Sequence, residues 1–223
     1  MVGAMSSSHS PDHPADPDPQ RNDRSELGPI AQRLQTGPLE PGLYVVATPI
    51  GNLRDITLRA LDILASVDVI YAEDTRQSRK LLDAYGIKKP LRPYHDHNGA
   101  VVRPEILSAL EEGKAIALIS DAGTPLISDP GYKLVRDVVD QGESVIPLPG
   151  PSAVITALSA AGLPTDTFLF AGFLPPKKAA RQSRLKELST LKGTLVFYET
   201  GPRLLEVLGD ILTILGDVDT VIA

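Results

Sequence analysis

The residues best suited to chemistry lie in four short stretches, each directly after an apolar run. These stretches are Thr48–Asn52, Glu73–Arg76, Ser120–Gly131 and Pro149–Ala153. They combine carboxylates and hydroxyls, which can hydrogen-bond to a ligand, with glycines, which permit positive φ and close approach of a ligand to the backbone. Each stretch alone is also explained by a turn or a helix cap. Their shared position after apolar runs favours a ligand site.

Two aspartates in the third stretch have different interpretations. Asp121 directly follows a buried run, where it could bind a hydroxyl or an amine of a ligand or could cap a local turn. Asp129 precedes Pro130 and Gly131, which favours an N-cap role for a helix that ends near Asp140.

Motifs for other chemistries are missing. The sequence contains no Gly-x-Gly-x-x-Gly after the first apolar run, no Walker lysine, no His-Glu-x-x-His and no Gly-x-Ser-x-Gly. It has no cysteine, which excludes a disulfide scaffold, a thiolate zinc site and a cysteine nucleophile. His95 and His97 could share one face of an extended segment, but two imidazoles and Asp96 are too few ligands, so we expect no metal and favour a polar loop that faces the substrate.

The elements that position these stretches alternate between two patterns. Near-continuous apolar runs suit strands covered on both faces, and they occupy residues 43–47, 67–71, 115–119, 145–148 and 194–198. Apolar residues spaced three or four apart predict helices, which fall within residues 58–64, 106–110, 135–139 and 204–215. This alternation predicts an α/β fold with a largely parallel sheet. In such a sheet ligands bind beyond the carboxyl ends of the strands, where the four stretches lie.

The chain divides into three predicted parts. Residues 1–41 contain no aromatic residue and are rich in Ser, Pro and Asp, so we expect a disordered tail, with order beginning near Pro41. Three prolines within residues 147–151 predict a boundary near residue 149. We therefore expect an N-terminal α/β domain over residues 42–148 and a C-terminal α/β domain over residues 149–223. No run reaches the roughly 20 apolar residues that cross a bilayer, and no signal peptide is visible, so we expect a cytoplasmic protein without a membrane partner.

The formal charge of −6 hides an uneven distribution. Residues 76–92 and 177–192 each have a net charge of +5, so the rest of the chain carries −16. Two basic segments on an acidic body suit a localised phosphate-binding face, although two solvated helix faces explain the same pattern.

The four stretches, extended to Thr48–Thr57, Ala72–Arg76, Ser120–Gly131 and Leu148–Ala153, resemble the ribosomal RNA small subunit methyltransferase I family within the tetrapyrrole methylase superfamily. The resemblance runs in unbroken order from Leu43 to Ala223. Tetrapyrrole and diphthine methyltransferases share this architecture but look closer to Gly-Asp-Pro in the loop after the third strand.

The resemblance implies two α/β domains with S-adenosylmethionine in the cleft between them, and a homodimer. It also implies 2′-O-methylation of a cytidine in small-subunit (16S) ribosomal RNA, either free or in the assembled 30S subunit. Members of the family continue beyond residue 223, so the C-terminal domain is expected to be incomplete relative to them. By motif, the expected cofactor-binding residues are Pro49, Ser120, Asp121, Ala122, Thr124, Pro125, Ser152, Ala153, Phe170 and Tyr198.

Methyl transfer to a ribose hydroxyl calls for a general base or a hydrogen-bond acceptor within reach of that hydroxyl. Of the candidates Glu73, Asp74, Asp121, Glu199 and His95, we favour Asp74 beside Arg76, because this pair could orient the hydroxyl and a phosphate together.

The expected RNA contacts come from both basic segments: Arg76, Arg79, Lys177, Lys178, Arg181 and Arg184. The alternatives are a small-molecule methyltransferase of the same architecture, such as one acting on tetrapyrroles, and an RNA-binding module without catalysis.

Overall fold

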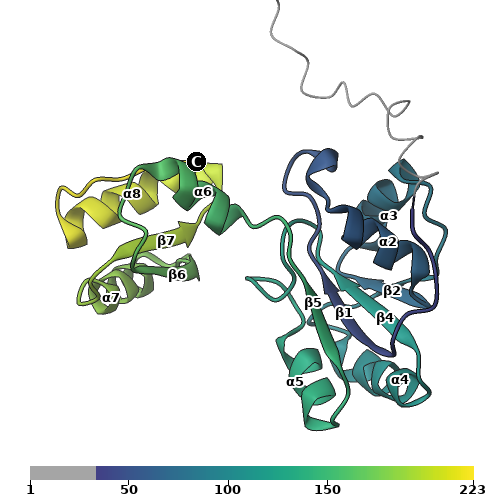
Figure 1. Cartoon of the computed structure of the whole chain (residues 1–223). Helices are drawn as coiled ribbons and strands as arrows, with labels where there is room; N and C mark the ends of the chain where they lie inside the picture. The colour runs from purple at the N-terminus through teal and green to yellow at the C-terminus, as the bar shows by residue number, and fades with distance from the viewer. Residues whose placement is uncertain (1–33) are drawn as a thin grey trace, which may run out of the picture.

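The computed structural model describes residues 34–223, which form two α/β units joined by the segment between β5 and α6 (Figure 1). Most of the expected disordered tail lies outside the described residues. Residues 34–40 have no regular secondary structure, yet Leu34 and Leu39 pack against the first core. The Gln35 backbone N–H also donates to the Asp62 carboxylate at 2.8 Å. The expected start of ordered structure near Pro41 is therefore too late.

The larger unit contains a fully parallel five-stranded sheet in the order β3-β2-β4-β1-β5. Its strands are β1 (Gly42–Val46), β2 (Val69–Ala72), β3 (Leu91–Pro93), β4 (Ala115–Ile119) and β5 (Val145–Leu148). Its helices are η2 (Leu53–Asp55), α2 (Leu58–Ser66), α3 (Thr75–Ala84), α4 (Gly99–Glu111) and α5 (Tyr132–Asp140). The expected α/β fold with a parallel sheet is confirmed. The short strand β3 was not among the expected strands, because its three residues carry no apolar run.

Each face of this sheet has its own core. On one face, α2 and α3 pack through residues such as Leu64 and Leu82 against Val46 and Ile70. On the other face, α4 and α5 pack through residues such as Ile106 against Leu43 and Leu118. The central strands β1 and β4 are buried along their whole length, as near-continuous apolar runs require.

The connections between strands create a switch point between β1 and β4. From β1 the chain passes through α2 and α3 on one face, and from β4 it passes through α5 on the opposite face. Because β1 and β4 are neighbours whose connections leave toward opposite faces, this is the position at which open parallel sheets form a ligand crevice at the carboxyl edge. The fold therefore predicts a ligand site at this position.

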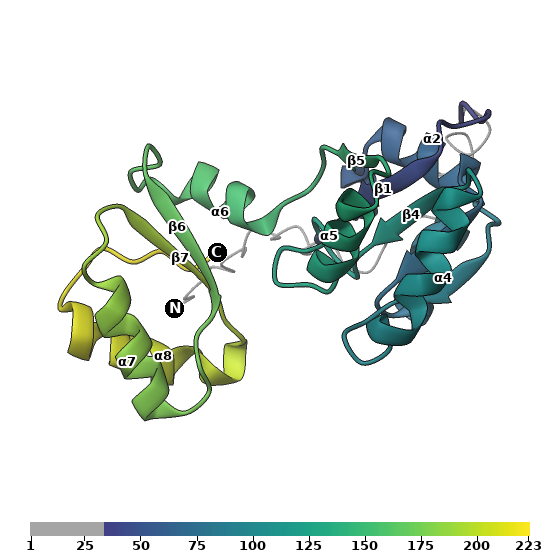
Figure 2. The same cartoon turned by 90° about the horizontal axis from the view of Figure 1, so that it is seen from below.

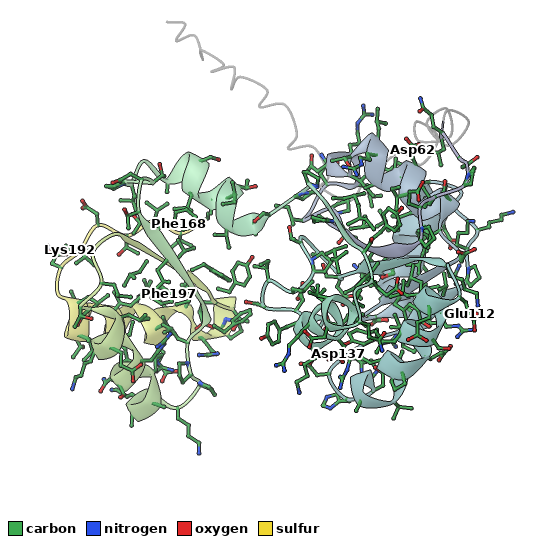
Figure 3. The ribbon with its side chains drawn as sticks, turned by 60° about the horizontal axis from the view of Figure 1, so that its bottom comes forward. Asp62, Glu112, Asp137, Phe168, Lys192 and Phe197 are labelled. Carbon is green, nitrogen blue, oxygen red and sulfur yellow. The ribbon has the colours of Figure 1, made fainter. Side chains whose placement is uncertain are left out.

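The smaller unit consists of α6 (Ala153–Ala161), β6 (Phe168–Phe173), α7 (Lys178–Leu188), β7 (Thr194–Tyr198) and α8 (Gly201–Leu215). Strands β6 and β7 lie side by side (Figure 2) and pair in parallel. Their register shifts between Phe170 and Phe173. A small cluster of buried apolar residues in this unit consists of Leu174, Leu185 and Val207, and Val154, Leu158 and Leu188 are buried as well. Phe197 on β7 packs against this core, whereas Phe168 on β6 is 41% exposed (Figure 3).

An ion cluster centred on the buried Arg181 joins α7 to α8. The Arg181 side chain is fully buried, and its guanidinium donates to the carboxylates of Asp210 at 2.6 Å and Glu206 at 2.5 Å. It also donates to the Pro176 carbonyl oxygen at 3.1 Å. The hydrogen bonds to Glu206 and Asp210 raise the pKa of Arg181, and hydrogen bonds from Gln182 and Arg181 lower the pKa of Asp210. The expected role of Arg181 as an RNA contact does not agree with this structure, because its guanidinium is already bound inside the unit.

We predict that Arg181→Ala destabilises the chain, because it leaves the Asp210 carboxylate buried without its cation. The melting temperature should fall by on the order of 10 °C, which circular dichroism would measure. Arg184→Ala on the same helix removes only an exposed pair with Glu187 and should change the melting temperature little. Equal effects of the two substitutions would contradict a structural role for Arg181.

Candidate functional site

Two loops are fastened together at the crevice. The backbone N–H of Thr48, after β1, donates to the Gly123 carbonyl oxygen at 2.9 Å, and the Gly123 N–H donates back to Thr48 at 2.9 Å. The buried Thr48 hydroxyl donates to the Ser120 carbonyl oxygen at 3.0 Å. The loop after β4 is thereby held against the loop after β1.

The loop from Ser120 to Gly131 has an unusual backbone. Gly123 and Gly131 have positive φ values of 82° and 135°, which glycine adopts at low cost. Leu126 and Ser128 also have positive φ, at 73° and 65°, which costs free energy for residues with a Cβ. Such strain tends to occur at ligand sites, where the surrounding structure compensates for it.

A third loop, after β5, closes against the first two. The Thr124 hydroxyl donates to the Pro151 carbonyl oxygen at 3.0 Å. A Cβ on Gly150 would lie only 2.7 Å from the Cβ of Ala47, so a glycine is needed for this close approach. Ser152 follows as the N-cap of α6 and makes no side-chain capping hydrogen bond, which leaves N–H groups of the first turn available to a ligand.

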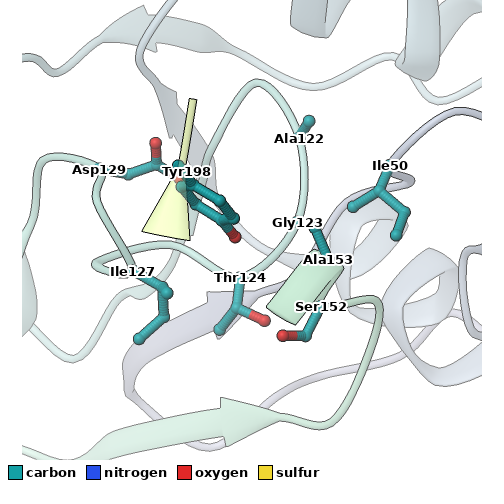
Figure 4. Close-up of a pocket in the computed structure, with 9 residues that line it drawn as sticks. All are labelled: Ile50, Ala122, Gly123, Thr124, Ile127, Asp129, Ser152, Ala153 and Tyr198. Carbon is teal, nitrogen blue, oxygen red and sulfur yellow. The ribbon is translucent and has the colours of Figure 1, made fainter. Parts of the chain in front are cut away.

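These three loops and the end of β7 line a cavity of about 230 Å³ (Figure 4). Its residues come from the loop after β1, the loop after β4, the start of α6 and the end of β7. They are Ile50, Ala122, Gly123, Thr124, Ile127, Asp129, Ser152, Ala153 and Tyr198. Both units therefore contribute to one site, at the switch point of the larger sheet.

The structure brings five of the expected cofactor-binding residues to the cavity wall: Ala122, Thr124, Ser152, Ala153 and Tyr198. The other five lie beside it. Ser120 and Pro125 are buried behind the wall, Asp121 is exposed, and Pro49 is half-buried. Phe170 packs edge-on against Tyr198, with ring centroids 4.7 Å apart, and so supports the wall without lining it.

The expected cofactor-binding residues did not include Ile50, Gly123, Ile127 and Asp129, which also line the cavity. The expected N-cap role of Asp129 is wrong, because α5 begins at Tyr132 with Gly131 as its N-cap. The positive φ values of Leu126 and Ser128 turn the chain before Asp129, which places this residue in the cavity wall instead. The sequence signal for a turn was the Ser-Asp-Pro-Gly stretch, but local rules assigned it to the helix.

Carboxylates gather near the cavity. Burial raises the pKa of Asp129, and the neighbouring charge of Asp121 raises it further, whereas a hydrogen bond from Ser120 works in the opposite direction. Burial also raises the pKa of Glu73, with contributions from Asp129 and Asp121. Carboxyl groups with raised pKa values are better proton acceptors near neutral pH than ordinary ones.

The pKa of Asp74, the expected base, is shifted in the direction opposite to those of Asp129 and Glu73. Its carboxylate caps α3 by accepting from the Arg76 backbone N–H at 2.8 Å, and it also accepts two hydrogen bonds from the Arg76 guanidinium at 3.1 and 3.3 Å. These bonds hold the pKa of Asp74 below its ordinary value. Asp74 is therefore a weak proton acceptor, although it stays ionised and fixed in orientation. The Asp74 backbone N–H donates to Asp121 at 3.0 Å, which ties this pair to the loop after β4.

The two other base candidates, His95 and Glu199, are not among the residues that line the cavity. The rings of His95 and His97 meet edge-on, with centroids 6.0 Å apart, and His95 Nδ1 is buried without a partner among the described residues. Glu199 directly follows Tyr198 but forms an ion pair with Arg203 at 3.2 Å. Within residues 34–223, no three His, Cys, Asp or Glu side chains are placed to hold a metal ion.

The expected RNA contacts other than Arg181 are exposed. Arg76 and Arg79 lie on α3, and Lys177, Lys178 and Arg184 lie at or on α7. The second basic segment ends at Lys192, at the end of the smaller unit away from the larger one (Figure 3).

We predict that Gly150→Ala loosens the site, because the added Cβ would overlap Ala47 and push the loops after β1 and β5 apart. The expected loss is about 1–3 kcal/mol in the free energy of unfolding, as for other overpacked positions, measured by urea denaturation. The double variant Ala47→Gly/Gly150→Ala removes the overlap and should recover part of the loss. A double variant no more stable than Gly150→Ala would show that this contact is not the cause.

Comparisons with known proteins show what this chain is similar to. A family model described as Tetrapyrrole (Corrin/Porphyrin) Methylases matches residues 42–223. A protein of Mesorhizobium japonicum named Ribosomal RNA small subunit methyltransferase I is 56% identical over 179 residues, covering 80% of this chain and 61% of that protein. A protein of Escherichia coli O157:H7 with the same name is 55% identical over 175 residues, covering 78% of this chain and 61% of that protein. The chain thus spans less than two thirds of the length of these relatives.

Solved structures show the same fold at low sequence identity. Uroporphyrin-III-C-methyltransferase from Thermus thermophilus superposes with a TM-score of 0.51 at 20% identity, covering 78% of this chain and 73% of that one. The methyltransferase CobJ superposes with a TM-score of 0.57 at 19% identity, covering 77% and 75% of the two chains. No helix among the described residues is long and apolar enough to span a membrane.

Proposed function

The chain belongs to the tetrapyrrole methylase family, and we propose that it transfers a methyl group from S-adenosylmethionine to the 2′-hydroxyl of a cytidine in small-subunit (16S) ribosomal RNA. The observation that carries this proposal is its similarity to relatives named Ribosomal RNA small subunit methyltransferase I, over a region that includes all the loops around the cavity. We further propose that it acts in the cytoplasm, as a homodimer, on ribosomal RNA or the 30S subunit.

The residues of the cavity fit the chemistry of this cofactor. The uncapped N-terminus of α6 offers N–H groups that suit the carboxylate of the methionine part. Ile50 and Ile127 offer apolar surface for the nucleoside, and Thr124 and Ser152 offer hydroxyls. Asp129 offers a negative charge to a cofactor that carries positive charge on its sulfur and its amino group.

S-adenosylmethionine would supply a methyl group on a positively charged sulfur, so the protein has mainly to position the acceptor hydroxyl and exclude water. Both units contribute residues to the wall of this site. Because Asp74 is held ionised by Arg76 near the loop after β4, we assign it the orientation of the ribose hydroxyl through an accepted hydrogen bond. Arg76, with a side chain 90% exposed, is placed to contact a phosphate.

We predict that Asp74→Asn lowers the rate of single-turnover methyl transfer at least about tenfold, because an amide orients a hydroxyl less firmly than a carboxylate. Asparagine also caps helices, so α3 should stay folded. The assay measures tritium transferred from the cofactor onto isolated small subunits, free ribosomal RNA and tetrapyrrole precursors.

Asp140→Asn, at the exposed end of α5, serves as the matched control and should keep the wild-type rate. A near-wild-type rate for Asp74→Asn would remove this residue from the mechanism. Transfer to a tetrapyrrole alone would contradict the proposed RNA substrate, and no transfer to any acceptor would contradict the proposed activity.

We also predict that the double variant Lys177→Gln/Lys178→Gln weakens RNA binding and flattens its dependence on salt. Each lost phosphate contact should reduce the slope of log affinity against log salt concentration by about 1. Lys114 directly precedes β4, at the amino-terminal edge of the larger sheet. Lys114→Gln removes one charge there and should leave the slope unchanged. Fluorescence anisotropy with a fragment of small-subunit RNA measures the slopes, and an unchanged slope in the double variant would exclude this surface.

A further inference from the structure

The cavity contains one charged lining residue. Among the residues that line it in the described part of the chain, Asp129 alone carries a formal charge, and the others are apolar side chains, hydroxyls, a glycine and one phenol. A ligand that fills this space therefore meets a single negative group.

Among the residues that the structure describes, the Asp129 carboxylate has no cation of its own. Within residues 34–223, no Lys, Arg or His side chain lies within 4.0 Å of it, the limit for a salt bridge. Its neighbours Glu73 and Asp121 are themselves acidic, and burial raises the pKa of Asp129. A half-buried carboxylate among like charges gains more than an exposed one from the arrival of a positive ligand.

An aromatic ring from the other unit stands beside this carboxylate. Tyr198, at the end of β7, lines the same cavity, and the negative charge of Asp129 adds to burial in raising the pKa of its phenol. The Tyr198 ring is held by Phe170, with centroids 4.7 Å apart, and by Phe173, with centroids 5.5 Å apart. Figure 4 shows Asp129 and Tyr198 next to each other on the cavity wall.

A carboxylate beside an aromatic ring suits a particular class of cation. A primary ammonium needs several hydrogen-bond acceptors, whereas a sulfonium bears three carbon substituents and donates no hydrogen bonds. Aromatic rings bind such onium groups through the negative charge on the ring face. Ile127, which lies on the same wall, adds apolar surface of the kind that an onium group with carbon substituents tolerates.

We propose that Asp129 and Tyr198 form a cation subsite that holds the positively charged sulfur of S-adenosylmethionine and distinguishes it from the neutral thioether product. This inference rests on the proposed function. It names the two residues that make the cavity prefer the charged cofactor over the neutral product. The subsite loses its ligand charge when the methyl group leaves, so the product S-adenosylhomocysteine is bound less tightly than the cofactor. The same contact therefore assists both cofactor capture and product release.

Isothermal titration calorimetry on the 223-residue chain tests this proposal with two probes, S-adenosylmethionine and S-adenosylhomocysteine. We expect Asp129→Asn to raise the Kd for S-adenosylmethionine by on the order of tenfold while changing the Kd for S-adenosylhomocysteine less than about twofold. Tyr198→Leu should likewise raise the Kd for S-adenosylmethionine more than the Kd for S-adenosylhomocysteine. Tyr198→Phe keeps the ring and should preserve the wild-type ratio of the two Kd values. Asp140→Asn repeats the charge change away from the cavity and should alter neither constant.

The binding of S-adenosylhomocysteine also reports whether each variant is folded, because it uses the rest of the cavity. An equal loss of both ligands in Asp129→Asn would overturn the cation subsite while leaving the proposed function intact. Unchanged binding of both ligands would overturn it as well. A wild-type chain that binds neither ligand would contradict the proposed function itself, and the subsite with it.

Discussion

Two reciprocal backbone hydrogen bonds between Thr48 and Gly123 fix the geometry on which the site depends. They join the loops that follow β1 and β4, the two neighbouring strands from which the chain leaves toward opposite faces of the sheet. Without this joint, the switch point would be an open gap between two loops of independent position. With it, the loop from Ser120 to Gly131 has a fixed origin, and its positive φ values at Leu126 and Ser128 turn the chain in one defined direction. The cavity wall at Asp129 follows from that turn.

The charges around this site are separated by sign. Glu73, Asp121 and Asp129 make the carboxyl edge of the larger sheet acidic, whereas exposed cations on α3 and at the start of α7 form basic surfaces. An acidic edge suits a positively charged cofactor, and basic residues beside it suit a phosphate backbone. The total charge of −6 averages over these regions and describes neither of them. The charge of a sequence segment can also mislead. Arg181 counts as a cation of the second basic segment, but it is paired with Glu206 and Asp210 inside the fold.

The sequence predicted the parts of the fold that depend on local patterns. The strands at 115–119, 145–148 and 194–198 have the expected bounds, and the first of them is buried along its whole length, as a continuous apolar run predicts. It could not predict the positions of Asp129 and Arg181. Asp129 before Pro-Gly fits the pattern of a helix N-cap. The positive φ values of Leu126 and Ser128, which no local rule favours, place Asp129 before the start of α5 instead. Arg181 finds its partners on α8, about thirty residues later, so a count of nearby charges cannot show that it is buried.

The contribution of the smaller unit to the cavity has a thermodynamic consequence. Ser128 Oγ lies 3.4 Å from where a Cβ would stand on Gly172, and Tyr198 closes the wall from β7, so the site needs the smaller unit to be folded. The central cluster of buried apolar residues in that unit is small and consists of Leu174, Leu185 and Val207, while Phe168 and Leu205 are exposed, which indicates modest stability of its own. A ligand that binds only the folded form then raises the stability of that form in proportion to the logarithm of its concentration. Ligand binding and the folding of the smaller unit are thus linked equilibria, and each strengthens the other.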